Sequence, residues 1–286
     1  MAIMTDDNER LVTTEKRGAV GIVSFDEPEA LNPLSTYPGG SEEQLADGIV
    51  AFDRDPDVKV IVVTGTGRAF SAGADARPAR TAAATTASPA DVAVLRALSA
   101  SPEVDEGGAW SMWYVLERCT KPLIAAVHGW CIAGGWEVAL WCDMIVADET
   151  ARFALAEINL GLFPAHATTF IARTAGRWRA AELSYTGRTI DVHEADELGL
   201  VTKLVPAGTD VDEAVALGNE IARFPLPALA AIRRVLNRAT ITTSEWEQNR
   251  RDFVLVGLSD SAKEWGARWR SDMQAKRPSP SGHSDR

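Results

Sequence analysis

The chain has 286 residues, of which 46% are hydrophobic and 24% are charged, and its formal net charge is −11. This length and apolar content are sufficient for one large core with a smaller appendage. The negative charge argues against nucleic acid as a partner, because binding a polyanion requires a basic stripe, which the sequence lacks. The sequence also lacks an 18-residue apolar run and a leader-like start, so we expect a cytoplasmic protein that neither spans a membrane nor is exported.

The first part of the chain is predicted to pass from a flexible end into a sheet. Residues 1–16 are polar and unpatterned, and we expect a flexible N-terminus there. The first strand is predicted at 17–26. A helix is predicted at 41–52, with Ser41 as its capping residue and acidic or amide side chains in its first turn.

Two matched segments, each a strand followed by a turn of small residues, are the main functional signal. Short β-branched runs predict buried strands at 58–64 and 122–127. The first leads to RAFSAGAD at 68–75, and the second leads to HGWCIAGGWE at 128–137. Small residues allow backbone N–H groups to approach a ligand, and two such donors on one oxygen form an oxyanion hole. The pair therefore favours chemistry on a carbonyl that becomes an enolate.

The region between and around these segments is predicted to be mostly helical. Residues 76–89 show no clear period and are predicted to form a loop beside the site. Helices are predicted at 92–98 and 110–118, separated by an acidic break at 103–108. No spacing of histidines or cysteines suggests a metal site. The three cysteines lack CxxC spacing and are predicted to be buried free thiols: Cys119, Cys131 and Cys142.

The last quarter of the chain is predicted to be helical. A strand at 200–205 ends near 206–209, and Asp210 is expected to cap the next helix. The apolar face of that helix is predicted to consist of Val211, Val215, Gly218 and Ala222. The prolines at 225–227 end it and start another helix, and a helical pattern continues over 246–276. The expected organisation is a flexible N-terminus (1–16), a core with the active site (17–206), a helical region (207–276) and a disordered tail (277–286).

The two turn segments, together with 142–147, 151–157 and 187–201, resemble the crotonase (enoyl-CoA hydratase/isomerase) superfamily. The resemblance covers about residues 18–278. It implies an α/β fold, which is a crotonase-like spiral of ββα units with a C-terminal helical oligomerisation region. It also implies an acyl-CoA substrate, no cofactor apart from the coenzyme A of that substrate, and a homotrimer or dimer of trimers.

The resemblance assigns roles to individual residues. Ala74 and Gly134 are expected to supply the oxyanion N–H groups. Glu137 and Glu157 correspond to the acid/base glutamates of family hydratases, which hold a water that attacks C3 of an enoyl thioester while a proton reaches C2. Apolar neighbours are expected to raise the pKa of these glutamates. Substrate contacts are expected from Ala72, Asp75, Trp136 and Pro164.

Several conspicuous residues have a structural interpretation as well. Asp75 is also a candidate cap for the segment that follows it, Asp143 is interpreted as an anchor at a strand edge, and His128 as a packed or hydrogen-bonded histidine. Tryptophans near the site belong either to an aromatic substrate pocket or to the core. They are Trp110, Trp113, Trp130, Trp136 and Trp141.

Two departures from the family pattern leave alternatives open. The family has proline followed by glycines after its second glutamate, whereas this chain has FPAHATT at 163–169. His166 either points inward as an acid/base group or packs outward, and an inward His166 would favour an isomerase or a C–C bond hydrolase. The basic residue that the family often has just before Asn32 is absent, which leaves Arg77, Arg80 or residues of the terminal helices as candidates for phosphate contacts.

The favoured function is an enoyl-CoA hydratase that adds water across a 2-enoyl-CoA thioester. The alternative from another class is a non-catalytic oligomeric binding protein. The presence of both glutamates and of small residues at both turns opposes that alternative.

Overall fold

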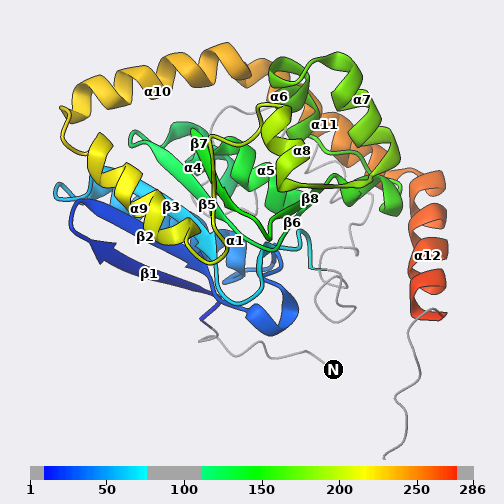
Figure 1. Ribbon diagram of the computed structural model, residues 1–286. Coiled ribbons are helices and arrows are strands. Elements are labelled where there is room, and N and C mark those ends of the chain that lie inside the picture. The colour runs from blue at the N-terminus through cyan, green and yellow to red at the C-terminus, as the bar shows by residue number, and fades with distance from the viewer. Residues whose placement is uncertain (1–9, 76–110, 276–286) are drawn as a thin grey trace, which may run out of the picture.

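The computed structural model describes residues 10–75 and 111–275, and its strands form two sheets (Figure 1). The larger sheet has the order β1 (Val12–Arg17), β2 (Val20–Phe25), β3 (Val60–Gly65), β5 (Leu123–Val127), β7 (Met144–Asp148) and β10 (Lys203–Val205). The smaller sheet has the order β4 (Ala69–Ser71), β6 (Trp130–Ile132), β8 (Arg152–Ala154) and β9 (Thr189–Asp191). β1 is antiparallel to β2, whereas β2, β3, β5, β7 and β10 run parallel.

Three strands of the larger sheet each lead into a strand of the smaller one, β3 into β4, β5 into β6 and β7 into β8. Helices follow these pairs along the chain: α4 (Ser111–Arg118), α5 (Gly134–Trp141), and then α6 (Ala167–Thr174) with α7 (Arg177–Thr186). This repetition is the predicted spiral of ββα units, and the predicted α/β fold class is confirmed.

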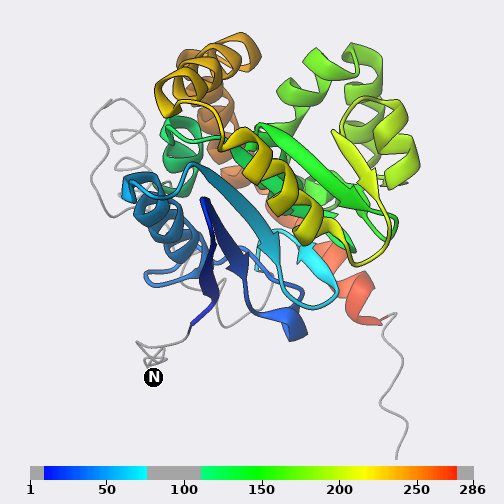
Figure 2. The same ribbon diagram turned by 60° about the vertical axis from the view of Figure 1, so that its left-hand side comes forward.

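Both faces of the larger sheet are covered, which explains why its parallel strands are mostly apolar. Alternate side chains of β3 point into the main core and towards α9 (Asp210–Ile221), which packs on the other face (Figure 2). A Cβ atom on Gly218 of α9 would lie 2.9 Å from Val20 Cγ2, so the helix lies close against the sheet. The predicted apolar face of this helix is confirmed, because its side chains pack on the second core cluster.

Three more helices complete the described chain: α10 (Leu226–Thr240), α11 (Thr243–Leu258) and α12 (Asp260–Ala275). Arg233 fixes α10 to the core, and its side chain is only 2% exposed. Its Nε atom lies 3.0 Å from Asp143 Oδ2, and its other nitrogens donate to carbonyls at the end of α4, those of Leu116, Glu117 and Cys119. One buried cation therefore satisfies both a carboxylate and the C-terminal carbonyls of a helix.

The predicted flexible N-terminus is wrong for residues 12–16, because they form the edge strand β1. Within residues 12–16 only Val12 is buried, and the polar side chains that follow it are partly or fully exposed. An antiparallel edge strand is held by backbone hydrogen bonds to one neighbour and tolerates polar side chains, so its sequence carries little strand signal.

The helix predicted at 41–52 is present as α1 (Ser41–Arg54), but its predicted cap is wrong. Gly40 is the N-cap residue. The Ser41 hydroxyl instead donates to Pro33 O at 2.7 Å and accepts from the Ser35 N–H at 2.9 Å. The serine therefore stabilises the loop before the helix rather than the first turn itself.

The predicted cap of α9 is also wrong, since the N-cap residue is Thr209. Asp210 Oδ2 lies 2.9 Å from His128 Nδ1, at the end of β5. Asp143 Oδ2 accepts from the Leu123 N–H at 2.7 Å as well as from the α10 arginine. The structural roles predicted for His128 and Asp143 are confirmed.

The other predictions concern helices, cysteines and membrane segments, and some of them fall outside the described residues. The helix at 110–118 is present as α4, and the 246–276 pattern is divided between α11 and α12. All three cysteines are free and buried, as predicted. Within 10–75 and 111–275, no helix is both long and apolar enough to cross a membrane. Outside the described residues lie the 76–89 loop, the 92–98 helix, the 103–108 break, Trp110, Arg77, Arg80 and the 277–286 tail.

Candidate active site

Asn32 anchors the first turn of the site. It is 1% exposed and follows η1 (Pro28–Ala30), in a stretch where Leu31 and Asn32 both have positive φ. Its Oδ1 atom accepts from the Glu27 N–H, and its Nδ2 atom donates to the carbonyls of Thr66 and Ala69 at 2.9 and 2.8 Å. Asparagine suits this position because it tolerates positive φ and carries both a donor and an acceptor.

The loop that Asn32 holds in place forms a parallel β-bridge with the first turn, between Leu34 and Ala74. This bridge leaves the backbone N–H of Ala74 available. Leu34 N donates to Gly73 O at 2.8 Å, and Asp75 N donates to Leu34 O at 2.9 Å. In such a parallel bridge the residue between these two partners, Ala74, directs its own N–H to the opposite side. No hydrogen bond among the described residues uses the Ala74 N–H, and Ala74 is exposed.

The second turn presents its N–H group at the start of α5. Ala133 has φ 52° and ψ −128°, a conformation that is strained for a residue with a Cβ atom. Its N–H donates to Ala154 O at 2.8 Å, which fixes the turn to β8. Gly134 is the first residue of α5, so its N–H has no acceptor within the helix.

The two turns touch each other. Gly73 has φ +79°, and a Cβ atom built on it would lie 2.9 Å from Ala133 Cβ and 3.2 Å from Gly134 N. A Cβ atom on Gly135 would lie 2.6 Å from Ser71 O. Only glycine allows this approach, which brings the turn containing Ala74 beside Gly134 as an oxyanion hole requires.

Glu137 lies in the first turn of α5 and is 6% exposed. Its Oε1 atom accepts from the N–H groups of His166 at 2.7 Å and Ala167 at 3.1 Å, where α6 begins. Burial raises the pKa of this carboxyl to about 7, while the two N–H bonds oppose the increase because they stabilise the ionised form.

Glu157 lies in the short helix η2 (Ala156–Leu160) and is 7% exposed. Neither of its carboxyl oxygens has a hydrogen-bond partner among the described residues. Burial, and then the negative charge of Glu137, raise its pKa well above the usual value. The two carboxyls therefore form a coupled pair, in which two backbone N–H bonds favour the ionised form of Glu137 and the lack of partners among the described residues favours the protonated form of Glu157.

The helix α12 fixes the position of η2. A Cβ atom on Gly161 would lie 3.0 Å from the Ala262 Cα atom, and one on Gly266 would lie 2.9 Å from Leu160 O. Glycines on both sides thus allow α12 to pack directly on the segment that carries Glu157. The C-terminal helices consequently support the carboxyl pair from within the same chain.

The His166 side chain points inward, and it does so into an aromatic environment. It is 2% exposed, and its ring centroid lies 4.6 Å from that of Trp113. Nδ1 is buried without a hydrogen-bond partner among the described residues. Burial, and then the charge of Arg250, lower the pKa of this imidazole to about 3, so it is neutral near pH 7 and does not favour an acid/base role.

The four predicted substrate contacts lie around these turns and carboxyls. The Ala72 N–H donates to Leu31 O at 2.9 Å, so Ala72 is part of the bridged first turn. Asp75 is 8% exposed, and its Oδ2 lies 3.5 Å from Ser35 Oγ. Trp136 is fully buried beside Glu137 in sequence, and its ring packs 5.2 Å from that of Phe153. Pro164 is buried and accepts from Thr168 Oγ1 at 3.0 Å, in the turn that leads to α6.

Sequence reasoning missed two groups. The backbone N–H donors at the start of α6 hold Glu137, and the proline followed by a helical pattern was the signal for them, since helix N-termini bind anions. Trp246 of α11 also contacts His166, with ring centroids 5.9 Å apart, and no local pattern indicates this contact.

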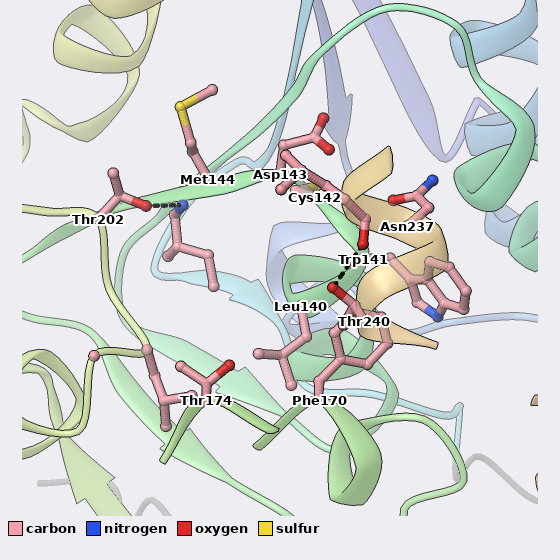
Figure 3. Close-up of a pocket in the computed structure, with 14 residues that line it drawn as sticks. Leu140, Trp141, Cys142, Asp143, Met144, Phe170, Thr174, Thr202, Asn237 and Thr240 are labelled. Carbon is pink, nitrogen blue, oxygen red and sulfur yellow. Dashed lines mark hydrogen bonds between the residues drawn. The ribbon is translucent and has the colours of Figure 1, made fainter. Parts of the chain in front are cut away.

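A separate pocket of about 200 Å³ lies at the other end of α5 (Figure 3). Its walls come from the end of α5 and the start of β7 (140–145), from Phe170 and Thr174 of α6, and from α10. Thr202 accepts from the Ile145 N–H at 3.1 Å on one side. The predicted catalytic glutamates do not line this pocket. Among the described residues no cluster of acidic, histidine or cysteine side chains suits a metal ion.

The spiral of ββα units with two touching glycine turns and a buried carboxyl pair is the framework of a crotonase-fold enzyme. A family model described as enoyl-CoA hydratase/isomerase matches residues 15–264. A probable mitochondrial enoyl-CoA hydratase of Dictyostelium discoideum is 34% identical over 226 residues, which are 79% of this chain and 74% of the relative. A putative enoyl-CoA hydratase of Thermus thermophilus is 35% identical over 230 residues, 79% of this chain and 83% of the relative.

Solved structures agree with these relatives. A carnitinyl-CoA hydratase from Mycobacterium avium matches with a TM-score of 0.75 at 28% identity, over 93% of this chain and 97% of its own. An enoyl-CoA hydratase subunit from Geobacillus kaustophilus matches with a TM-score of 0.69 at 32% identity, over 94% of this chain and 97% of its own. The chain therefore belongs to the enoyl-CoA hydratase/isomerase family.

Proposed function

We propose that the protein is an enoyl-CoA hydratase that adds water across the double bond of a 2-enoyl-CoA thioester. The observation that carries the proposal is the buried pair of Glu137 and Glu157, of which Glu137 accepts two backbone N–H bonds and Glu157 has no hydrogen-bond partner among the described residues. The names of the relatives support the same reaction.

The thioester oxygen is placed against the N–H groups of Ala74 and Gly134. As water adds at C3, negative charge develops on this oxygen, and each preorganised donor stabilises it by about 3 kcal/mol. The positive end of α5 adds to this effect, because Gly134 is its first residue. The oxyanion site therefore lowers the barrier to enolate formation without any charged side chain.

The carboxyl pair moves the two protons. Glu137, which ionises more readily, accepts a proton from water as the water oxygen bonds to C3. Glu157, whose raised pKa favours the protonated form, delivers a proton to C2 as the enolate collapses. One water is consumed, C3 gains the hydroxyl and C2 gains the hydrogen. Proton return from Glu137 to Glu157 then restores the starting state.

Two other functions receive less support. An isomerase or C–C bond hydrolase using His166 requires an imidazole that titrates near neutrality, whereas burial lowers the pKa of this one to about 3. A non-catalytic binding protein offers no reason to bury both Glu157 oxygens without partners, since such burial is destabilising.

The test is hydration of short 2-enoyl-CoA thioesters, followed by the loss of conjugated thioester absorbance. We expect Glu137→Gln and Glu157→Gln to lower kcat by about 10²–10⁴-fold, as loss of a general acid or base does. Glu117→Gln is a matched control, because Glu117 is partly buried with Oε2 enclosed but lies at the end of α4. Wild-type activity in either site variant would contradict the proposed mechanism.

Oligomeric state and location belong to the same proposal. A homotrimer or dimer of trimers is supported by exposed apolar side chains on α10, where Ile232 and Val235 are 57% and 55% exposed. Analytical ultracentrifugation measures this state directly. We also propose a cytoplasmic location and no cofactor apart from the coenzyme A of the substrate. Cell fractionation tests the location, and activity of the protein purified in chelator tests the cofactor.

A further inference from the structure

Four aromatic side chains from four helices meet beside the carboxyl pair. Trp113 of α4, Trp141 of α5, His166 at the start of α6 and Trp246 of α11 form this aromatic cluster. The His166 ring centroid lies 4.6, 5.7 and 5.9 Å from the three indole rings, in that order. All four side chains are at most 6% exposed, so they fill the space that they enclose.

The cluster does not form a polar network. Within the described part of the chain, the indole nitrogens of Trp141 and Trp246 and the Nδ1 atom of His166 are buried without hydrogen-bond partners. The rings contact one another by tilted and edge-on packing, and the Arg250 guanidinium lies 5.3 Å from the centroid of the Trp246 ring. Closely packed rings of this kind form a wall that leaves little room for substrate atoms.

The position of the cluster along α5 relates it to the substrate. Gly134, Glu137 and Trp141 follow one another on this helix, with spacings of about 4.5 and 6 Å at a rise of about 1.5 Å per residue. Glu137 and Trp141 are four residues apart and share a face. His166 contacts both Glu137 and Trp141, because its backbone N–H donates to Glu137 Oε1 while its ring packs against Trp141.

An acyl chain is consequently confined in length. With the thioester oxygen at Gly134 and C3 at the level of Glu137, the carbons beyond C3 that continue along α5 reach the level of Trp141. The aromatic cluster occupies that space.

We propose that the aromatic cluster closes the acyl end of the active site and restricts the enzyme to short 2-enoyl-CoA thioesters of about four carbons. This inference rests on the proposed hydratase function and adds the substrate class.

The experiment measures kcat/KM for straight-chain 2-enoyl-CoA thioesters of four, six, eight and ten carbons. For the wild type we expect kcat/KM to fall at least about tenfold between four and eight carbons, since one methylene that does not fit a pocket is worth about 10–200-fold. Equal or higher kcat/KM for the eight- and ten-carbon substrates would overturn the inference. Absence of turnover with every substrate would instead contradict the proposed function.

Two variants test the cluster directly. His166→Ala keeps the backbone N–H that holds Glu137 but removes the ring, and Trp113→Leu shortens the wall from another helix. We expect either variant to raise the eight-carbon to four-carbon ratio of kcat/KM by about tenfold or more. Phe170→Ala is the control, because Phe170 packs 5.0 Å from Trp141, with which it lines the pocket at the far end of α5, but is not part of the aromatic cluster (Figure 3). An unchanged ratio in a folded variant, or an equal increase in the control, would overturn the inference.

Discussion

Substitution of Gly73 by alanine tests how closely the two turns must approach. Gly73 has φ +79°, where a Cβ atom costs about 1 kcal/mol. The new Cβ atom would also lie 2.7 Å from Ile132 O and 2.9 Å from Ala133 Cβ, inside ordinary van der Waals contact. Relief of that overlap moves the turns apart and costs a further 1–3 kcal/mol or so, as overpacking does.

The same movement separates the N–H groups of Ala74 and Gly134. Loss of one oxyanion donor is worth about 3 kcal/mol, which is a decrease in kcat of about 100-fold. Steady-state hydration kinetics and urea unfolding measure the two effects on the same preparation. We expect Gly73→Ala to lower both kcat and the free energy of unfolding.

Gly176→Ala is the matched control for this prediction. Gly176 has φ +86°, but a Cβ atom built on it would meet nothing within 4 Å. This variant therefore carries backbone strain without the overlap. Because its φ of 86° and ψ of 160° are essentially restricted to glycine, we expect a loss of about 1–3 kcal/mol of stability with unchanged kcat. The reasoning is refuted if Gly73→Ala retains wild-type kcat.

Four other predictions concern charges. Because burial raises the pKa of Glu137 to about 7, kcat/KM should fall as pH decreases through about 7, and a flat profile would contradict its role as the base. The raised pKa stabilises the fold fully below about pH 4.5 and is lost as pH rises through 7, so Glu137→Gln should unfold at a higher temperature than wild type at pH 8. Arg233→Met leaves Asp143 buried without a counter-ion and should cost about 3–5 kcal/mol in urea unfolding, whereas a loss below about 1 kcal/mol would show that the pair is dispensable. For His128, burial lowers the pKa but the hydrogen bond and charge of Asp210 outweigh it, so NMR titration should give a value above 6.5 that decreases in Asp210→Asn.

Strand prediction succeeded where both faces of a strand are buried and failed at the edge of the sheet. The runs at 58–64 and 122–127 are β-branched and apolar, and they correspond to β3 and β5. The polar strand β1 was not predicted, because an edge strand is stabilised by backbone hydrogen bonds, which do not require a particular pattern of side chains. Strands could therefore be predicted only where burial on both faces restricts their side chains to apolar types.

Local capping signals failed when a distant partner competed for the side chain. Asp210 has the sequence of a helix cap, yet it pairs with His128, 82 residues earlier in the chain. Ser41 similarly bonds the preceding loop instead of the first turn of α1. Propensity describes what a residue does in an isolated segment, and tertiary contacts override it.

The sequence by itself determined the chemical groups of the site and the turns that carry them. The small-residue turns at 68–75 and 128–137 follow from local pattern, because turns depend on neighbouring residues, whereas the resemblance to the family selected Glu137 and Glu157 as candidate acid/base groups. Only the tertiary structure decided how these groups act on one another. Burial raises the pKa of both glutamates, the N–H groups at the start of α6 favour the ionised form of Glu137, and helices α4, α5 and α11 enclose the His166 ring and leave it neutral. Both outcomes depend on desolvation by residues far apart in the chain, which no local pattern records.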